Sequence, residues 1–309
     1  MKVFITGATG VLGRRVVKSL ISKNISVVAL SRSSQNSELL KNLGAESKQA
    51  GLFNANEMVE ATKGCDAILH LATHIPQKAM PRLKDWELND RIRVDGTKNL
   101  VVAAVKNKID IFICEGIADV HGQQNGNFVS AETAIPQQQI KMLESAVEME
   151  DIIRRKLNPN YLTLRFGHFY AADAFHTKDL IAKVSRGKMP MLGKGDFYWN
   201  LIHLDDAADS IVFGLDNFQK LKARPLDVSD FNPLLFSELL NRLSAITGGK
   251  KAFTLPLFIA KLILGKNTFA FLTNSFRLKQ DPLLKDWKPK HPDFISGIKE
   301  IINQKSGCK

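Results

Sequence analysis

The stretch Thr6-Gly7-Ala8-Thr9-Gly10-Val11-Leu12-Gly13 decides the fold of this 309-residue chain. Residues 3–6 before it form an apolar run that predicts a strand, and residues 11–22 after it have the spacing of an amphipathic helix. Glycines at these positions allow a tight turn, a close approach of the backbone to a pyrophosphate, and close packing of helix on strand. The helix N-terminus adds free N–H groups and a positive dipole end. We therefore predict a dinucleotide site whose contacts are Gly7, Thr9, Gly10, Val11, Leu12 and Gly13.

Outward from this loop, short apolar runs alternate with helical segments through the first half of the chain. We expect strands at 27–30, 67–71, 109–114 and 161–165, and helices at 36–43, 86–106 and 141–155. Alternation of this kind predicts an α/β fold with a Rossmann-type, doubly wound parallel sheet. Later helices are expected at 234–247, 257–264 and 294–303. We assign residues 1–165 to an NAD(P)-binding domain and 166–309 mostly to a small substrate-binding cap, partly interleaved with it.

Composition and charge restrict the class of protein. With 44% hydrophobic and 24% charged residues the chain resembles an ordinary globular protein, and no apolar run is long enough for an integral membrane segment. The first residues enter a strand without the layout of a signal peptide, and Cys65, Cys114 and Cys308 have neither metal-ligand nor disulfide spacing. A cytoplasmic location is the resulting expectation.

The net charge is +12, and residues 248–309 contribute +8 of it, with twelve Lys/Arg against four Asp/Glu. These lysines are scattered singly, without the arginine–aromatic pattern of nucleic-acid modules, so we expect no nucleic-acid partner. One alternative stays open for residues 257–264. With Lys250, Lys251, Lys261 and Lys266 they could lie on an anionic membrane surface, although a helix packed on the pocket explains them more simply.

The end of the second strand indicates which dinucleotide is preferred. NAD enzymes usually place Asp or Glu there to hold the ribose hydroxyls. This chain has Leu30-Ser31-Arg32-Ser33-Ser34 instead, and a guanidinium matches the geometry and charge of a 2′-phosphate. Ser31 and Arg32 therefore predict NADP(H), with NAD(H) left open.

Beyond the loop TGATGVLG, four further segments resemble the extended or atypical short-chain dehydrogenases/reductases, which include NAD-dependent epimerases and dehydratases. They are GCDAILHLA (64–72), GTKNL (96–100, with Arg93 where many members have Asn), LRFGHFY (164–170) and NLIHLDDAA (200–208). The resemblance covers nearly the whole chain. It implies that the backbone near Leu71 and Ala72 passes the cofactor and that the C-terminal part builds a substrate pocket. We also expect cofactor contacts at Leu52 and Phe53.

The family's chemistry normally rests on Tyr-x-x-x-Lys and an upstream Ser or Thr, and this chain contains no Tyr-x-x-x-Lys. In the matching segment PQQQIK (136–141), Gln137 stands in place of the tyrosine and Lys141 matches the lysine. In FICEGIADVHG (112–122), Ile117 replaces the serine and His121 a structural tyrosine. We take Lys141, His121 and Gln137 as the catalytic candidates, with Lys141 also holding the nicotinamide ribose.

Other polar residues near these segments have less specific expectations. Glu115 and Asp119 are carboxylates close to the predicted mouth of the site, and His74, His168 and Tyr170 either line the pocket or serve as packing residues. His203, Asp205 and Asp206 resemble metal ligands at first sight. Their place in the family pattern favours turn and helix-start roles, so no metal site is predicted.

Two functions follow from these residues. The favoured one is an NAD(P)-dependent oxidoreductase, epimerase or dehydratase, acting on a small or nucleotide-linked carbonyl or hydroxyl substrate with an acid/base group other than the usual tyrosine. The alternative is a catalytically silent NADP(H)-binding sensor or regulatory protein, because both proton-handling residues are replaced. The expected partner is a small-molecule substrate, and a homodimer is left open.

Overall fold

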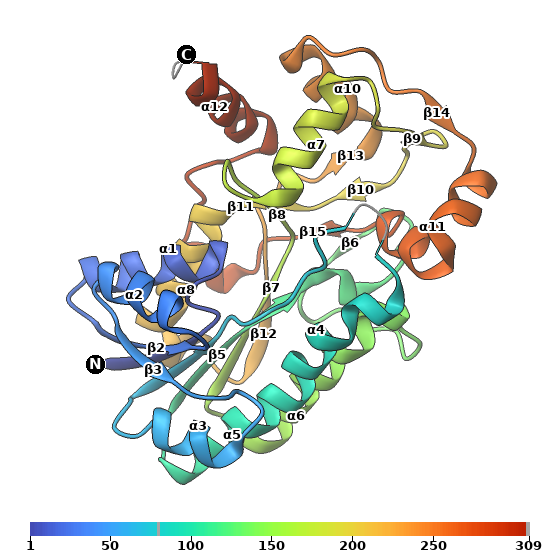
Figure 1. Cartoon of the computed structure of the whole chain (residues 1–309). Coiled ribbons are helices and arrows are strands. Elements are labelled where there is room, and N and C mark those ends of the chain that lie inside the picture. The colour runs from blue at the N-terminus through green and yellow to red at the C-terminus, as the bar shows by residue number, and fades with distance from the viewer. Residues whose placement is uncertain (79–80, 307–309) are drawn as a thin grey trace.

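The computed structural model describes residues 1–78 and 81–306, and its centre is a sheet of seven parallel strands (Figure 1). The order across the sheet is β12-β7-β5-β4-β1-β2-β3, so the direction of winding reverses beside β1. Doubly wound sheets bind ligands at that reversal. The strands are β1 (Lys2–Thr6), β2 (Ser26–Ser31), β3 (Glu46–Gln49), β4 (Ala67–His70), β5 (Ile111–Ile117), β7 (Tyr161–Phe166) and β12 (Arg224–Val228).

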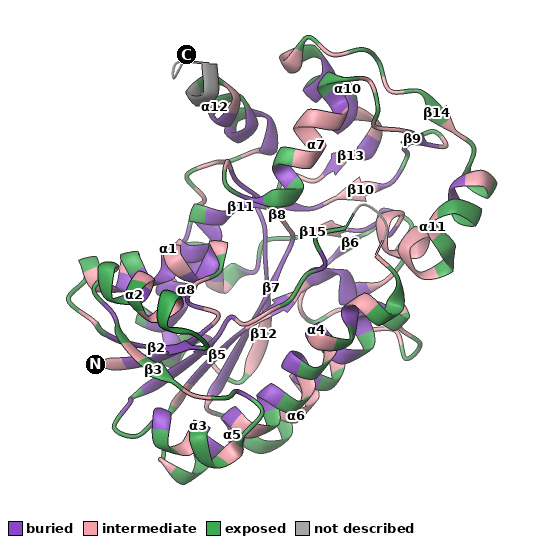
Figure 2. Cartoon of the chain, viewed as in Figure 1, coloured by how far each residue is buried: buried purple, intermediate pink, exposed green. Residues whose placement is uncertain are grey.

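Helices cover both faces of the sheet, which explains why the inner strands are apolar throughout. One face carries α1 (Val11–Ser22), α2 (Ser34–Asn42) and α8 (Leu204–Asp216), and the other carries α3 (Ala55–Ala61), α5 (Thr97–Lys106) and α6 (Glu144–Leu157). Each face buries its own hydrophobic cluster, and the two clusters hold most of the large buried side chains. In Figure 2 the strands of the sheet have the colour of buried residues along much of their length. The predicted doubly wound parallel sheet is thus confirmed.

Most of the cap follows β7 in the chain, but the chain returns once to the sheet before the cap is complete. Segment 204–228 supplies α8, the short helix α9 (Phe218–Leu221) and edge strand β12. The cap helices pack around a third hydrophobic cluster. They are α7 (Phe175–Ser185), α10 (Phe236–Thr247), α11 (Leu257–Leu272) and α12 (Phe294–Ser306). Short strand pairs complete the region: β8 (His168–Tyr170) with β11 (Leu201–His203), β9 (Met191–Leu192) with β14 (Thr254–Leu255), β10 (Tyr198–Trp199) with β13 (Leu234–Leu235), and β6 (Phe128–Val129) with β15 (Arg277–Leu278).

Several elements differ from the expectation. The predicted helix at 86–106 is divided, because a π-helical turn (Ile92–Gly96) separates α4 (Glu87–Arg91) from α5. Strand β5 continues three residues beyond the predicted end at 114. The helix predicted from 141 has only a 3₁₀ turn (Lys141–Leu143) before α6 begins at Glu144. Strand β3, helix α3 and strand β12 were not predicted.

No helix among the residues that the structure describes has both the length and the apolar character needed to cross a bilayer. Two of the three cysteines, Cys65 and Cys114, are buried free thiols, and Cys308 lies outside the described residues.

The buried His70 at the end of β4 predicts a loss of stability in acid. Its ring is 2% exposed, and burial lowers its pKa to about 4. An unfolded chain takes up the proton near pH 6.5, so the contribution of this group is complete above that pH and is lost as the pH falls toward 4. We expect urea unfolding to show a loss of roughly 2–3 kcal/mol from this group between pH 7 and 4.5.

A His70→Asn variant is expected to be less stable at pH 7 but to lose less on acidification, while a variant of the exposed His74, His74→Asn, keeps the wild-type dependence. An unchanged acid dependence in His70→Asn would contradict the assignment.

Candidate active site

The glycine loop between β1 and α1 has a geometry that only glycine permits at two positions. Gly7 has φ +75°, and a Cβ on it would lie 2.3 Å from the carbonyl oxygen of Leu71. A Cβ on Gly13 would lie 2.1 Å from the carbonyl oxygen of Gly7. The loop, the first turn of α1 and the end of β4 are therefore in backbone contact. Gly10 precedes α1 with no side-chain cap, which leaves the first N–H groups of the helix for a ligand.

The remaining loop residues take different positions around this turn. Thr9 and Val11 are half-buried, whereas the Leu12 side chain is 5% exposed and packs in the core beneath the sheet. Leu12 can therefore reach a ligand only through its backbone. Ala72 follows Leu71 directly and lies beside the loop, as the contact between Gly7 and Leu71 requires.

At the end of β2 the side chains of Ser31 and Arg32 have separate roles. Ser31 is buried, and its hydroxyl donates to the Ser33 carbonyl at 2.8 Å and accepts from the Ser37 hydroxyl at 3.0 Å. Ser33 caps helix α2 through its own hydroxyl. Arg32 is exposed, and its guanidinium forms no hydrogen bond or ion pair with a described residue. The serines fix the turn and the arginine is left to contact a ligand.

Leu52 and Phe53 follow β3 at the neighbouring edge of the sheet. Leu52 is buried so closely against Gly96 that a Cβ there would come within 2.8 Å of its side chain. Phe53 is 41% exposed, and the guanidinium of Arg91 lies 4.4 Å from the centre of its ring. Leu52 is thus a packing residue, while Phe53 presents an exposed ring face.

Lys141 and Gln137 are not brought together by the fold. Gln137 is exposed in a bend that precedes the 3₁₀ turn, so the two residues do not share a helix face. The Lys141 side chain is 62% exposed, and its ammonium lies 2.5 Å from the Glu144 carboxylate, which raises its pKa. Two side chains four residues apart in the sequence lie together only when the segment between them is helical.

His121 is a structural residue in this fold. Its ring is fully buried, and Nε2 lies 2.9 Å from the carboxylate of Asp227 on edge strand β12. The ring also packs against Phe276, with centroids 5.8 Å apart. A group that exchanges protons with substrate must reach a cavity, and nothing of the His121 side chain is exposed. This geometry does not favour the catalytic role expected from the sequence.

A different histidine and carboxylate meet where the tips of β5 and β7 lie side by side. The Nε2 atom of His168 lies 3.1 Å from one carboxylate oxygen of Asp119 and 3.3 Å from the other. Burial alone would lower the pKa of His168, but the charge and hydrogen bond of Asp119 outweigh it and the net pKa is raised. Asp119 holds one ring nitrogen and leaves Nδ1 to face other groups. The His168 side chain is 23% exposed and Asp119 only 3%.

The His168–Asp119 pair lines a narrow cleft between the sheet and the cap, which in this structure is too closed to admit a water molecule, so a substrate would enter only if its walls moved apart. The ring of Trp199 meets His168 edge-on with centroids 5.0 Å apart, and the ring centre of Phe271 on α11 lies 5.8 Å from that of His168. The other lining residues are Gly167, Tyr198, Asn200, Asn274 and Phe276. The cleft therefore combines one titratable pair with aromatic walls.

Two buried amides hold the walls of this cleft in place. Asn274 donates through Nδ2 to the Asp119 carbonyl at 3.1 Å. Asn200 donates to the Phe276 carbonyl at 2.9 Å and accepts from the Leu278 N–H at 2.8 Å. The sequence placed Asn200 in a family segment but gave no sign that Asn274 would contact Asp119, 155 residues away.

A carboxylate with a shifted pKa lies on β5. Burial raises the pKa of Glu115 to about 7, and the charge of the buried Arg93 opposes that rise. Glu115 is half-buried, and its neighbour Cys114 pairs with His70 at the end of β4. Glu115 therefore lies on β5, which is separated from β1 and its glycine loop by the single strand β4.

The two other residues expected at the pocket lie elsewhere. Tyr170 is 2% exposed, its hydroxyl donates to the Asp293 carbonyl at 3.4 Å, and burial raises its pKa far above the ordinary value. His74 is exposed, and its backbone N–H donates to Asn89 at 2.9 Å. Tyr170 is a packing residue of the cap.

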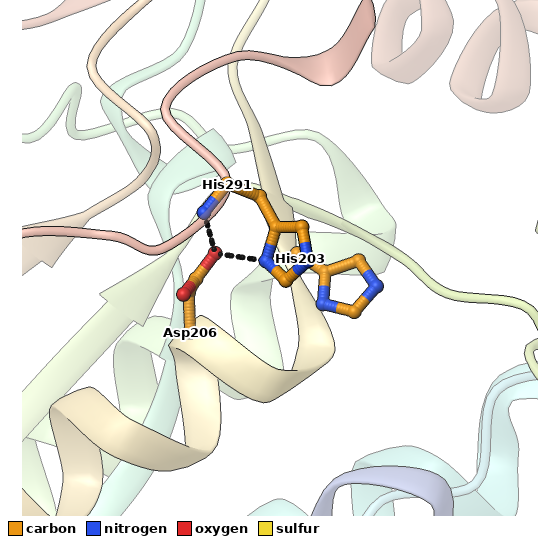
Figure 3. A group of neighbouring side chains, drawn as sticks. All are labelled: His203, Asp206 and His291. Carbon is orange, nitrogen blue, oxygen red and sulfur yellow. Dashed lines mark hydrogen bonds and ion pairs between the residues drawn. The ribbon is translucent and has the colours of Figure 1, made fainter. Parts of the chain in front are cut away.

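His203, Asp206 and His291 form the one group with metal-ligand atoms in mutual reach among the described residues (Figure 3). Their hydrogen bonds give them structural tasks. His203 accepts from the Asp205 N–H at the start of α8, and Asp206 accepts the N–H groups of Lys290 and His291 and the His291 ring. The two imidazoles stack with centroids 3.8 Å apart and planes at 32°. The Nδ1 atom of each ring already has a protein partner, the Asp205 N–H for His203 and the Asp206 carboxylate for His291.

Comparison with known proteins adds a family to this geometry. The family model described as "NAD dependent epimerase/dehydratase family" matches residues 3–228, which span β1 to β12 and include the glycine loop and the His168–Asp119 pair.

Similar proteins include relatives of known activity and a solved structure. The 3-diazoavenalumate denitrifying reductase of Streptomyces sp. is 22% identical over 96% of this chain and 99% of its own length. The decarboxylating sterol-4-alpha-carboxylate 3-dehydrogenase of Dictyostelium discoideum is 38% identical, but over only 24% of this chain and 22% of its own length. The UDP-glucose 4-epimerase of Thermotoga maritima, solved with UDP-glucose, is 17% identical and covers all of both chains with a TM-score of 0.78.

Proposed function

The chain belongs to the NAD dependent epimerase/dehydratase family, and we propose that it is an NADP(H)-dependent oxidoreductase that interconverts a carbonyl and a hydroxyl group on a small apolar molecule. The observation that carries this proposal is the His168–Asp119 pair in an aromatic cleft, on the same edge of the sheet as the glycine loop. A titratable pair at this place supplies the proton transfer that the missing tyrosine would otherwise provide.

The residues present fit a dinucleotide. The close backbone packing that glycine allows at Gly7 and Gly13 fixes the loop against β4 and α1, and the uncapped start of α1 suits the pyrophosphate. Arg32 would hold the 2′-phosphate of NADP(H). When bound, the dinucleotide supplies or accepts the hydride, and one proton completes the balance between carbonyl and hydroxyl.

We assign that proton to His168. In the reducing direction its imidazolium gives a proton to the carbonyl oxygen, and Asp119 stabilises the charged ring beforehand and orients it. In the oxidising direction the neutral ring accepts the proton from the hydroxyl. This assignment takes the place of His121, which is enclosed, and of Lys141 and Gln137, which lie apart.

The walls of the cleft support a small apolar substrate over a nucleotide-linked one. The half-buried rings of Trp199 and Tyr198 lie at the cleft, and no lysine or arginine is among the described residues that line it, although the Arg277 guanidinium lies 5.0 Å from the centre of the Tyr198 ring. The names of the Streptomyces reductase and the Dictyostelium dehydrogenase support oxidoreduction as the class of reaction. We propose that the cap, residues 166–309 apart from α8 and β12, supplies the substrate contacts.

The choice of coenzyme is tested by replacing Arg32. We expect Arg32→Ala to weaken NADPH binding by about 10–100-fold, since one or two charge-assisted hydrogen bonds to the 2′-phosphate are lost. NADH binding, which lacks that phosphate, should change by less than about threefold on the same reasoning. Titration of both coenzymes by calorimetry gives the two affinities.

The exposed Lys41 on α2 offers a matched control, because Lys41→Ala removes the same charge from the neighbouring helix. Equal loss of both coenzymes in Arg32→Ala would refute the NADP(H) preference. If neither coenzyme binds the unmodified chain, the proposed function fails as a whole.

A further inference from the structure

Exposed apolar side chains gather on one short part of the cap. Thirteen large apolar residues are exposed in the described part of the chain, and five of them fall between 253 and 263. They are Phe253 (52% exposed), Leu257 (45%), Phe258 (76%), Leu262 (84%) and Ile263 (53%). Figure 2 shows much of the outer end of α11 in the colour of exposed residues. A contiguous apolar patch of this kind marks an interaction surface more often than chance exposure does.

Contacts with the rest of the cap fix the position of this patch. Strand β14 pairs with β9 just before α11 begins, and Ala260 is fully buried in the cap. Beyond a kink at Gly265, the second half of α11 packs inward, where the Trp199 ring donates through Nε1 to the Leu272 carbonyl at 3.1 Å. The first half therefore presents Phe258 and Leu262, one helical turn apart, on a rigid outward-facing ridge.

The charge around the ridge has a single sign. From residue 239 to 280 the chain contains seven Lys/Arg and no Asp or Glu. Four of these, Lys250, Lys251, Lys261 and Lys266, are exposed and form no ion pair with a described residue. Lysines beside an exposed apolar face are the arrangement by which interfacial helices bind anionic bilayers.

We propose that the first half of α11 is a peripheral membrane-binding surface that inserts Phe258 and Leu262 among the acyl chains of an anionic bilayer, while Lys261 and Lys266 contact lipid phosphates. A second copy of the chain fits this surface less well. In a two-fold interface the two positively charged segments would face each other, and residues 239–280 contain no Asp or Glu to pair with the lysines. The surface lies on the membrane without spanning it, since α11 has only 16 residues.

Vesicle flotation of the full chain tests this surface. We expect binding to vesicles of phosphatidylcholine and phosphatidylglycerol at 3:1, weak binding to pure phosphatidylcholine, and release at high salt. Phe258→Ser/Leu262→Ser and Lys261→Glu/Lys266→Glu should each reduce binding to the anionic vesicles by at least about tenfold. Val102→Ser/Val105→Ser, on the exposed face of α5, removes apolar surface elsewhere and should leave binding unchanged.

Three results would overturn the proposal. One is absence of binding to anionic vesicles by a chain that still binds NADPH, and another is equal binding by all variants. The third comes from light scattering without vesicles. If the chain forms a dimer that Phe258→Ser/Leu262→Ser converts to a monomer, the ridge is an interface between copies. Dinucleotide titration of each variant checks that the fold is intact, and its outcome is independent of membrane binding.

Discussion

A Gly10→Glu variant is expected to lose at least about 100-fold in NADPH affinity, close to 2.7 kcal/mol, while its stability stays the same or rises slightly. Gly10 has φ −70° and ψ 169°, an extended conformation open to any residue, so the substitution does not strain the backbone. Its Cβ would lie 3.2 Å from the Gly7 carbonyl oxygen, tight but not prohibitive. The new carboxylate would occupy the position proposed for the pyrophosphate and repel it.

The expected loss of NADPH affinity and the expected unchanged or higher stability distinguish lost binding from unfolding. A carboxylate at the start of α1 interacts favourably with the helix dipole, so a general weakening of the fold cannot explain lost binding. Ser22→Glu places the same charge at the far end of α1 and should keep NADPH affinity. Calorimetric titration and urea unfolding give the two quantities. Undiminished NADPH affinity in a folded Gly10→Glu chain would mean that the dinucleotide does not lie on this loop.

The parts of the site that the sequence could predict are local. The glycine loop needs only eight consecutive residues, and the constraints that identify it, a turn and a close backbone approach, act within that stretch and against the end of the next strand. The inner strands could also be predicted from the sequence, because burial on both faces makes them apolar. The edge strands were not: β3 has the sequence ESKQ and β12 contains Pro225, and each pairs on one side only.

The pair proposed for proton transfer, His168 and Asp119, depends on long-range packing, and the sequence therefore did not predict that the two residues meet. Asp119 and His168 are 49 residues apart and meet because β5 and β7 are neighbours in the sheet. Each lies just beyond the end of its strand, and that shared position was the one signal available. His121 was chosen from its place in a motif, but its partner Asp227 lies on the unpredicted strand β12. Gln137 and Lys141 had helical spacing in a segment that is not helical.

His168→Gln is expected to lower kcat/KM for NADPH-dependent reduction of apolar aromatic ketones by about 100–1000-fold, the usual contribution of a general acid. NADPH affinity should remain within about twofold, since the cleft is separate from the loop on which the dinucleotide is proposed to bind. Steady-state rates and calorimetry on the same preparations measure both. Lys178→Gln, at an exposed position of α7, changes another cap side chain and should leave the rate unaltered.

The pH profile separates proton transfer from simple positioning. The carboxylate of Asp119 raises the pKa of His168, so the protonated ring should persist to higher pH and the reduction rate should fall as the pH rises through that raised pKa. Asp119→Asn removes the charge and should move this fall to lower pH, and His168→Gln should abolish it. Full activity in His168→Gln would refute the assignment and direct attention to Glu115, whose pKa burial raises to about 7. Tight NADPH binding without reduction of any ketone would instead favour the silent, cofactor-sensing alternative, because the dinucleotide would then serve as a signal and not as a reductant.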